Sequence, residues 1–465
     1  MLICIKEGEQ GLMKVLLVRP KPDSETIGLQ NVMICEPLEL EYIGAYLEPL
    51  GHKVTIIDMI LEKKSLAHFI NEYRPHVVGI TAYIAHINVV KKYAKEIKLT
   101  APLCKVVVGG VHAEVVPEDF KNENIDYIVY ANGLKTFANI LMSLNTKEEH
   151  LPIEGVWNSE ETKCPKETIF NYPHPNRELS ARYRKNYYYM FHNPCALIKT
   201  SYGCPYQCKF CFCREITDGK YFTRDLKDII EEIKSIKERE LYIVDDDFLV
   251  DRNRILNFYT LLKENYLDKK FLIYARADFI AANEDIIKEF SLVGLRAVIV
   301  GLESSNEEEL KKYNKKSSVD INERAISILK KHNVECYGAL ILGVDWEVKD
   351  FNRLYKWIKK IDIKFINLQP FTPLPGTELF QEYKDKLIVP REEHEKWDLA
   401  HLTVQPSQMS IRKYYWNIIK LYYKVTMSPK NVLKIIKEYG IKENIKLSLG
   451  ACKITMQYFV KMFRN

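Results

Sequence analysis

Three cysteines stand within eight positions of one another in the middle of the chain. They are Cys204, Cys208 and Cys211, spaced CxxxCxxC, and they follow an apolar run that reads as a strand. A structural zinc ion is normally held by four protein ligands in a closed shell. A [4Fe–4S] cubane held by three thiolates leaves one iron open to bind another molecule. A set of three thiols therefore favours an open cluster.

Two simpler interpretations compete with this one. Cysteines of intracellular proteins are often inert buried side chains, and Cys213 could complete a zinc shell with the other three. Three cysteines so close together are unexpected in a chain with 11 Cys among 465 residues. Ligands only two residues apart, as Cys211 and Cys213 would be, strain a tetrahedral shell. The open cluster is therefore the favoured interpretation.

The cysteine motif resembles that of the radical S-adenosylmethionine superfamily, and Phe210 fits the aromatic position before the third cysteine. The resemblance implies a [4Fe–4S] cluster on Cys204, Cys208 and Cys211. It also implies that the open iron chelates S-adenosylmethionine, which one electron cleaves to a 5′-deoxyadenosyl radical. A small electron-donor protein, such as a flavodoxin or a ferredoxin, is then expected as a partner.

The bulk composition is that of an ordinary globular protein of two to four domains, with 47% hydrophobic and 28% charged residues. The net charge of +6 is spread among acidic residues and predicts no nucleic-acid binding. The remaining cysteines are scattered, which indicates a reducing cytoplasm. No signal peptide and no transmembrane segment are predicted.

The elements of the first third alternate between strand and helix. We expect five strands there and a doubly wound parallel α/β sheet, whose ligands lie beyond the carboxyl ends of the strands. The expected strands are 13–18, 54–58, 77–81, 105–110 and 125–130, and the expected helices are 40–50, 65–73 and 89–99.

This third resembles the cobalamin-binding domain that precedes many radical S-adenosylmethionine cores. The third-strand end Gly79-Ile80-Thr81-Ala82 and the run Gly109-Gly110-Val111-His112-Ala113 carry the resemblance. It implies cobalamin contacts at six residues, with the glycine pair admitting the nucleotide tail: Thr81, Ala82, Tyr83, Gly109, Gly110 and His112.

The sequence departs from that family in two places. Cobalamin domains that ligate cobalt from below have DxHxxG, which many members fused to radical cores lack. This chain has Asp58-Met59-Ile60-Leu61-Glu62-Lys63, so no histidine can ligate cobalt from that position. The run Tyr130-Ala131-Asn132-Gly133-Leu134 replaces the usual Gly-Glu-Gly-Glu. The alternative is a sheet domain that has lost its cofactor.

The strand–helix alternation resumes at Ala196 after a polar linker. Six strands and five helices predict a partial (β/α)6 barrel of the TIM type, with its chemistry at the carboxyl ends of the strands. The expected strands are 196–201, 240–245, 271–275, 297–301, 336–342 and 365–369, and the helices are 226–237, 252–265, 285–292, 319–332 and 348–360.

Polar motifs follow several of these strands, and the resemblance implies roles for them in binding S-adenosylmethionine. Asp245 and Asp246 are the candidates for its amino group, and Arg276 for its carboxylate because of the bidentate guanidinium. Glu303, with Ser304, is expected at the ribose, and Gly343 at the adenine. The neighbouring Asp247 and Asp251 are expected only to stabilise a helix N-terminus.

The sequence predicts four regions: a cobalamin-binding domain at 13–145, a linker at 146–190, the radical barrel at 191–377 and a helical C-terminal region at 378–465. The resemblance implies a cobalamin-dependent enzyme in which methylcobalamin methylates an unactivated carbon of a small molecule after hydrogen abstraction. A cobalamin-dependent cyclase or rearranging enzyme, a radical enzyme with an empty sheet domain, and a non-catalytic cluster- or zinc-binding protein stay open. We expect substrate specificity to reside after Thr377, around Trp397, His401 and Met409.

Overall fold

The computed structural model describes residues 11–27, 32–146, 151–158, 164–167 and 170–464. The chain forms two compact units. The first contains residues 1–23, 37–167 and 171–183, and the second contains 24–36, 168–170 and 184–465. The described residues 24–27 and 32–36 thus belong to the second unit, although they precede most of the first unit in the sequence.

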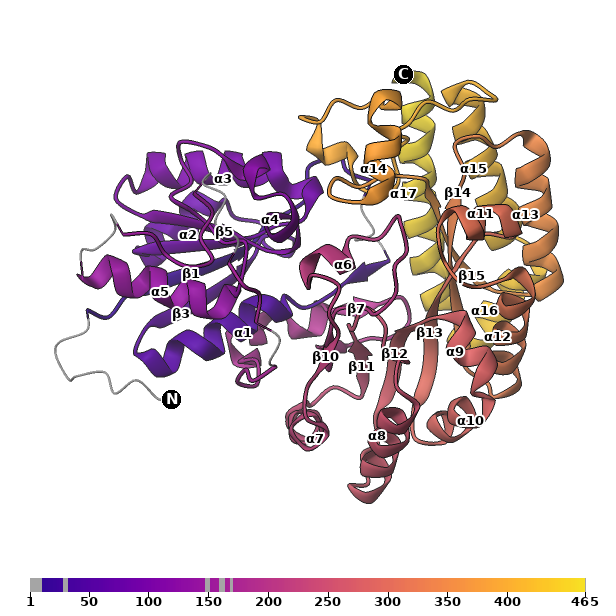
Figure 1. Ribbon diagram of the computed structural model, residues 1–465, viewed down its shortest axis with the longest axis horizontal. Coiled ribbons are helices and arrows are strands. Elements are labelled where there is room, and N and C mark those ends of the chain that lie inside the picture. Colours follow the sequence, from indigo (N-terminus) through magenta and orange to yellow (C-terminus); the bar gives the residue numbers. More distant parts are fainter. Residues whose placement is uncertain (1–10, 28–31, 147–150, 159–163, 168–169, 465) are drawn as a thin grey trace. The chain divides into compact units, whose positions relative to one another are not determined.

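The first unit is a five-stranded parallel sheet in the order β3-β1-β4-β5-β6 (Figure 1). This is the doubly wound sheet that the alternation of elements predicted. Its strands are β1 (Lys14–Arg19), β3 (Lys53–Asp58), β4 (Val77–Thr81), β5 (Lys105–Gly109) and β6 (Tyr127–Ile128).

Helices cover both faces of this sheet because alternate strand residues point to opposite sides. One apolar core joins Leu16, Val78 and Val106 to α2, α3 and α4, and the other joins Leu17, Ile56 and Val107 to α1 and α5. The helices are α1 (Leu38–Leu47), α2 (Leu66–Tyr73), α3 (Ile87–Thr100), α4 (Val111–Val115) and α5 (Gly133–Thr146).

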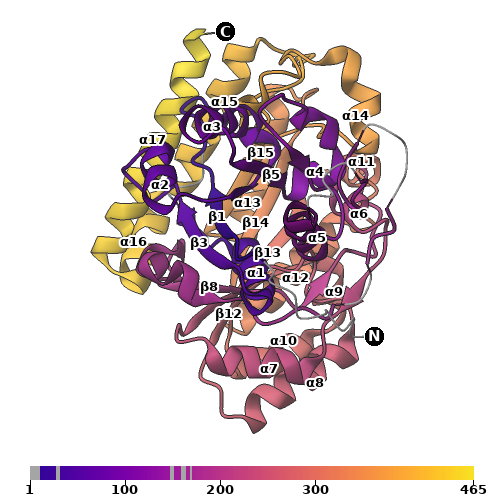
Figure 2. The same cartoon turned by 90° about the vertical axis from the view of Figure 1, so that its left-hand side faces the viewer.

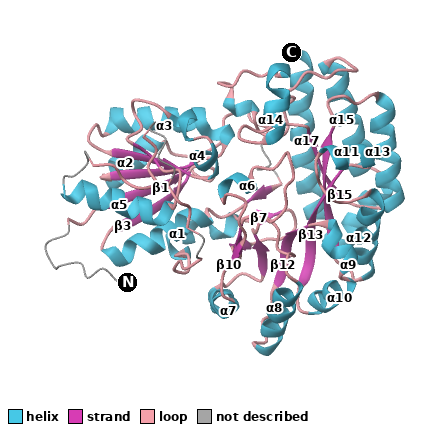
Figure 3. Ribbon diagram, in the orientation of Figure 1, coloured by secondary structure: helices cyan, strands magenta, loops and turns pink. Residues whose placement is uncertain are grey.

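The second unit is built on six parallel strands in the order β15-β14-β13-β12-β11-β8, drawn in magenta in Figure 3. The partial barrel expected from the sequence is confirmed. The strands are β8 (Cys195–Ile198), β11 (Glu240–Ile243), β12 (Lys270–Ala275), β13 (Leu295–Glu303), β14 (Glu335–Leu342) and β15 (Phe365–Pro370).

Helices surround the outside of the partial barrel, and four of them, α7, α8, α11 and α12, start at side-chain caps that satisfy their first N–H groups. Asp251 caps one of them, as the sequence predicted, by accepting from the N–H groups of Asn253 and Arg254. The helices are α7 (Leu226–Ser235), α8 (Arg252–Glu264), α9 (Ala277–Ala282), α10 (Glu284–Leu292), α11 (Glu307–Lys312), α12 (Val319–Lys331) and α13 (Val348–Ile361).

Two short antiparallel ribbons accompany the barrel. β9 (Ser201–Tyr202) pairs with β10 (Phe222–Thr223), and β2 (Met33–Ile34) pairs with β7 (Tyr188–Tyr189). The first ribbon encloses the cysteine loop and the short helix α6 (Cys213–Ile216).

The C-terminal region is helical, as expected. Figure 2 shows α16 and α17 running along its left-hand edge. None of the helices in the described ranges is long and apolar enough to cross a membrane. The helices are α14 (Glu378–Tyr383), α15 (Ile411–Thr426), α16 (Pro429–Tyr439) and α17 (Ile441–Arg464).

Candidate functional site

The cysteine loop begins where β8 ends and is folded back on itself by the β9–β10 ribbon. Gly203 has φ of 77°, a left-handed conformation that glycine adopts without strain. Within the loop the N–H of Cys211 donates to the carbonyl of Cys208 over 3.2 Å. Cys204, Cys208 and Cys211 are partly accessible free thiols at the carboxyl end of the barrel strands.

Arg276, just after β12, lies against this loop. Its Nη1 is 3.8 Å from Cys208 Sγ, and its guanidinium lies 3.8 Å from the ring centroid of Tyr206. Asp278 and the carbonyl of Lys315 accept the two N–H groups of its Nη2 at 2.8 and 2.5 Å. The sequence predicted Arg276 at the carboxyl ends of the barrel strands, which we call the barrel mouth. The structure places it there, beside a predicted cluster ligand.

The donor set fits an open cubane better than a single ion. Over the described ranges, no three His, Cys, Asp or Glu side chains gather closely enough to hold one metal ion. Each thiolate of a cubane binds a different iron, so its sulfurs stand farther apart than the ligands of one ion. Cys213 hydrogen-bonds through its side chain to Cys211 and Asp246. The four-cysteine zinc site thus lacks the required geometry.

The three aspartates after β11 have different surroundings. Asp245 is buried and accepts from the backbone N–H of Thr200 at 2.7 Å and the hydroxyl of Ser201 at 2.7 Å. Asp246 accepts from the N–H of Gly203 at 3.0 Å. Both carboxylates therefore hold the start of the cysteine loop.

Asp247 is the aspartate whose carboxylate oxygens can still accept hydrogen bonds. It is buried, yet neither carboxylate oxygen has a hydrogen-bond partner of ordinary geometry among the described residues. Burial raises the pKa of Asp247 to about 7, although the positive charges of Arg276 and Lys315 lower it. The sequence predicted only helix capping by Asp247, because the order of residues along a loop does not reveal which side chain turns inward.

Glu303, the last residue of β13, forms a buried ion pair with Lys315, whose Nζ lies 2.8 Å from Glu303 Oε1. The backbone at Glu303 has φ of 59°, at an irregularity in the pairing of β13 with β14. The sequence around Lys315 does not reveal that the turn after α11 brings this lysine next to Glu303 at the barrel mouth.

Ser304 and Gly343 lie at the same end of the barrel. The hydroxyl of Ser304 donates to Glu309, and the indole N–H of Trp346 also donates to Glu309. A Cβ on Gly343 would meet the indole of Trp346. Glu309 and Trp346 are thus two further residues of the mouth that sequence reasoning did not identify.

In the first unit, the residues expected to contact cobalamin lie where β4 and β5 end. The hydroxyl of Thr81 donates to Glu39 at 3.1 Å, Ala82 is buried, and Tyr83 is exposed. Gly110 has φ of 109°, and a Cβ there would stand 2.8 Å from the backbone N and O of Ala82. Gly109 is the last residue of β5, where a Cβ would meet only Val129 at ordinary distance.

Asp58 and His112 of the first unit each already have a partner within that unit. Arg19 donates to the buried Asp58 through Nε at 3.0 Å and through a second nitrogen. His112 is buried, with Nε2 2.7 Å from Asp119 Oδ2. The missing Cβ at Gly110 lets the backbone after β5 lie close to that of Ala82, and His112 is held inside the unit's own packing.

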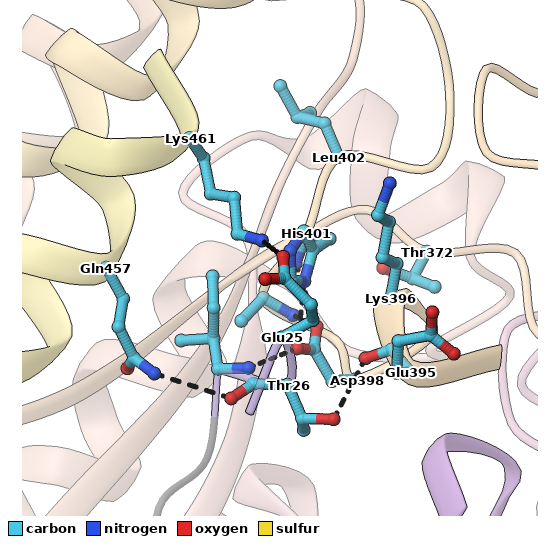
Figure 4. Close-up of polar contacts among 12 residues, drawn as sticks. Glu25, Thr26, Thr372, Glu395, Lys396, Asp398, His401, Leu402, Gln457 and Lys461 are labelled. Carbon is cyan, nitrogen blue, oxygen red and sulfur yellow. Dashed lines mark hydrogen bonds and ion pairs between the residues drawn. The ribbon is translucent and has the colours of Figure 1, made fainter. Parts of the chain in front are cut away.

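The segment after the barrel contains a second buried His–Asp pair. Asp398 Oδ2 lies 2.9 Å from Nδ1 of the buried His401, and it accepts from the N–H of Ile27 at 2.6 Å. Figure 4 shows this pair near Glu25 and Thr26, which also contact Lys461 and Gln457 of α17. The segment expected to carry specificity is therefore fixed to residues 25–27.

Family models match both units of this architecture. The B12 binding domain model matches residues 25–141, and the radical SAM superfamily model matches residues 198–358. The chain belongs to the B12-binding radical S-adenosylmethionine enzymes. Its cofactors are accordingly a [4Fe–4S] cluster, S-adenosylmethionine and cobalamin.

Curated relatives of this B12-binding radical enzyme align along most of its length. Hopanoid C-3 methylase of Methylococcus capsulatus is 26% identical, covering 91% of this chain and 83% of its own. The anaerobic magnesium-protoporphyrin IX monomethyl ester cyclase of Rubrivivax gelatinosus is 24% identical, covering 85% of this chain and 74% of its own.

Solved structures share the fold of the B12-binding radical enzyme. The cobalamin-dependent S-adenosylmethionine radical enzyme OxsB superposes with a TM-score of 0.70, covering 97% of this chain and 72% of its own at 14% identity. The radical methyltransferase TsrM from Kitasatospora setae gives 0.67, covering 90% of both chains at 16% identity. At these identities the likeness establishes the architecture.

Proposed function

We propose that this enzyme transfers a methyl group to an unactivated carbon of a small molecule. The observation that carries the proposal is the combination of a B12-binding unit and a three-cysteine barrel with a methylase relative that covers 91% of the chain. The cluster and S-adenosylmethionine supply a radical when bound, and cobalamin supplies a methyl group. The residues of the chain bind, orient and shield these groups.

In this proposal the barrel mouth holds the zwitterionic end of S-adenosylmethionine between charges of opposite sign. Asp247 is our first choice for the ammonium group, because Asp245 and Asp246 already accept hydrogen bonds from the cysteine loop. Arg276 can offer a guanidinium N–H to the carboxylate. Glu303 would accept from the ribose hydroxyls, and its ion pair with Lys315 holds its carboxylate in place.

The first unit would hold cobalamin along the ends of β4 and β5. Thr81, Tyr83 and the Gly109–Gly110 pair form the edge that the cofactor would approach. Because His112 is already bonded to Asp119, we propose that cobalt is held without a protein histidine.

A second candidate is ring formation without methyl transfer. It is favoured by the cyclase relative, whose alignment covers 85% of this chain. Both candidates need an external one-electron donor, for which a flavodoxin or ferredoxin in the cytoplasm is the expected source.

Isotope transfer distinguishes the two candidates. The reconstituted full chain is incubated without oxygen with S-adenosylmethionine bearing a deuterated methyl group, a chemical reductant and a metabolite extract of cells that lack the protein. A methyltransferase yields 5′-deoxyadenosine together with a product that carries the labelled methyl group. A dehydrogenated, unlabelled product would support the cyclase and overturn our proposal. A Cys208→Ala variant is the control, since both products must then disappear.

A further inference from the structure

The last helix of the chain presents an apolar face to solvent along its whole length. Its exposed side chains include those at positions 441, 445, 449, 452, 456, 460 and 463, which recur every three or four residues and so share one face. We call the apolar members of this set the α17 stripe: Ile441, Ile445, Leu449, Met456, Val460 and Phe463. A helix of 24 residues extends for about 36 Å.

The opposite face of α17 is already packed within the second unit. Tyr458 and Met462 are buried in the main apolar core. Lys461 donates to Glu25 at 2.5 Å, and Gln457 donates to the carbonyl of Thr26 (Figure 4). Core packing therefore explains the inner face and leaves the α17 stripe, where Leu449, Met456 and Phe463 are each at least 60% exposed, without a structural role.

The apolar surface continues onto α15. The ring of Trp416, itself 47% exposed, packs edge-on against Phe459 at 6.4 Å, and Phe459 contacts Phe463. The guanidinium of Arg412 lies 5.3 Å from the centre of the Phe463 ring. Aromatic and arginine side chains gathered in this way are typical of surfaces with one apolar and one aqueous side.

Basic side chains border this surface. Residues 411–465 contain twelve Lys and Arg but only two acidic residues, whereas the whole chain has a net charge of only +6. Six of the basic side chains are exposed on the three helices: Arg412, Lys413, Lys420, Lys437, Lys442 and Lys453.

We infer that α15, α16 and α17 bind the surface of an anionic lipid bilayer, with α17 lying in the plane of the interface. Apolar side chains can enter the acyl boundary, while the surrounding lysines meet anionic headgroups. A second copy of the chain fits this face less well than an anionic bilayer does. Pairing two copies through this face would bring two strongly basic surfaces together, and these would repel each other. The inference does not depend on the reaction proposed above.

Vesicle flotation of the reconstituted full chain tests this inference. We expect the protein to float with vesicles of phosphatidylcholine mixed with phosphatidylglycerol, and much less with phosphatidylcholine alone. The triple variant Ile445→Gln/Leu449→Gln/Met456→Gln should lower the partition coefficient about tenfold or more, because it removes inserted apolar area. Raising the salt concentration should weaken binding of the wild type.

A control variant uses apolar side chains elsewhere in the chain that are at least as exposed as those of the triple variant. Leu99→Gln/Leu103→Gln changes two exposed leucines of the first unit and should leave partitioning unchanged. Quenching of Trp416 by brominated lipid, read against Trp416→Phe, provides a second measurement. Equal flotation of the triple variant and the wild type would overturn the inference. A concentration-dependent dimer that the triple variant abolishes would also overturn it, in favour of a self-interface.

Discussion

Arg276 Nη1 lies 3.8 Å from Cys208 Sγ, while the same guanidinium stacks on Tyr206. A fixed positive charge beside a cluster ligand stabilises the electron-rich state of the cluster. Asp278 and the carbonyl of Lys315 hold the guanidinium in this position, so its orientation is fixed before S-adenosylmethionine binds.

Replacing this charge should make the cluster harder to reduce. For Arg276→Gln we expect the midpoint potential to fall by about 60 mV, the one-electron equivalent of a tenfold change in equilibrium constant. Redox titration followed by electron paramagnetic resonance gives the value. Arg296→Gln, at an exposed arginine near the start of β13, is the control. An unchanged potential would mean that Arg276 acts only on S-adenosylmethionine.

The buried pair Glu303–Lys315 should behave as a unit in a double-mutant cycle. Lys315→Met leaves a buried carboxylate without its partner and should cost about 3–5 kcal/mol of unfolding free energy. The double variant Glu303→Gln/Lys315→Met removes both charges and should regain most of that loss. Denaturant unfolding measures stability, and equilibrium dialysis measures S-adenosylmethionine binding, which should stay weak in both variants. Additive destabilisation in the double variant would argue against coupling.

The sequence was sufficient to predict the residues that parallel strands bring to one edge. Arg276 directly follows β12 and Glu303 is the last residue of β13, so their placement needs only the alternation of strand and helix. Lys315 comes after the additional helix α11, and no local pattern indicates that it returns to Glu303.

The choice among neighbouring aspartates also required the structure. Asp245, Asp246 and Asp247 are chemically identical, and their roles depend on which backbone N–H groups each one meets. Likewise, the packing of residues 24–36 with the second unit rests on contacts such as Ile27 N–H to Asp398, which join positions far apart in the chain.

Cys213 should be dispensable for cluster assembly. It hydrogen-bonds to Cys211 and Asp246 but is not one of the three predicted ligands. Cys213→Ala should retain about four irons per chain, as a cubane requires, and should still cleave S-adenosylmethionine. Cys211→Ala is the matched variant two residues away, and it should lose both properties. Equal iron loss in the two variants would indicate a four-cysteine site.

Binding of S-adenosylmethionine should strengthen as the pH rises through about 7. Burial raises the pKa of Asp247 to about 7, with Asp278 also raising it and Arg276 and Lys315 opposing. Below that pH the carboxyl group is protonated and cannot pair with an ammonium group. One pH unit below the pKa, about a tenth of the molecules carry the charge, so affinity should fall about tenfold.

The same shift has a consequence for stability. Because the folded-state pKa lies above the value of about 3.9 in the unfolded chain, the folded protein binds the extra proton between these values. Asp247 therefore lowers stability progressively as the pH rises through this window. Asp247→Asn should flatten both pH profiles, while Asp251→Asn, at the exposed cap of α8, should preserve them. A pH-dependent affinity that survives in Asp247→Asn would exclude this assignment.

Cobalt in the loaded protein should have no histidine ligand from the chain. Asp58, at the position where a DxHxxG motif would start, is bonded to Arg19, and His112 Nε2 is bonded to Asp119. His86, in the short 3-10 helix after β4, has its pKa lowered to about 4 by burial and by the charge of Arg19, so its imidazole is neutral and is tested together with His112. Electron paramagnetic resonance of the reduced cobalt(II) form reports ligation, because a coordinated nitrogen splits each cobalt line. We expect His86→Ala and His112→Ala to give the wild-type spectrum, because any nitrogen splitting would then come from the cofactor's own base. Nitrogen splitting that disappears in one of these variants would identify that histidine as the ligand and refute the prediction.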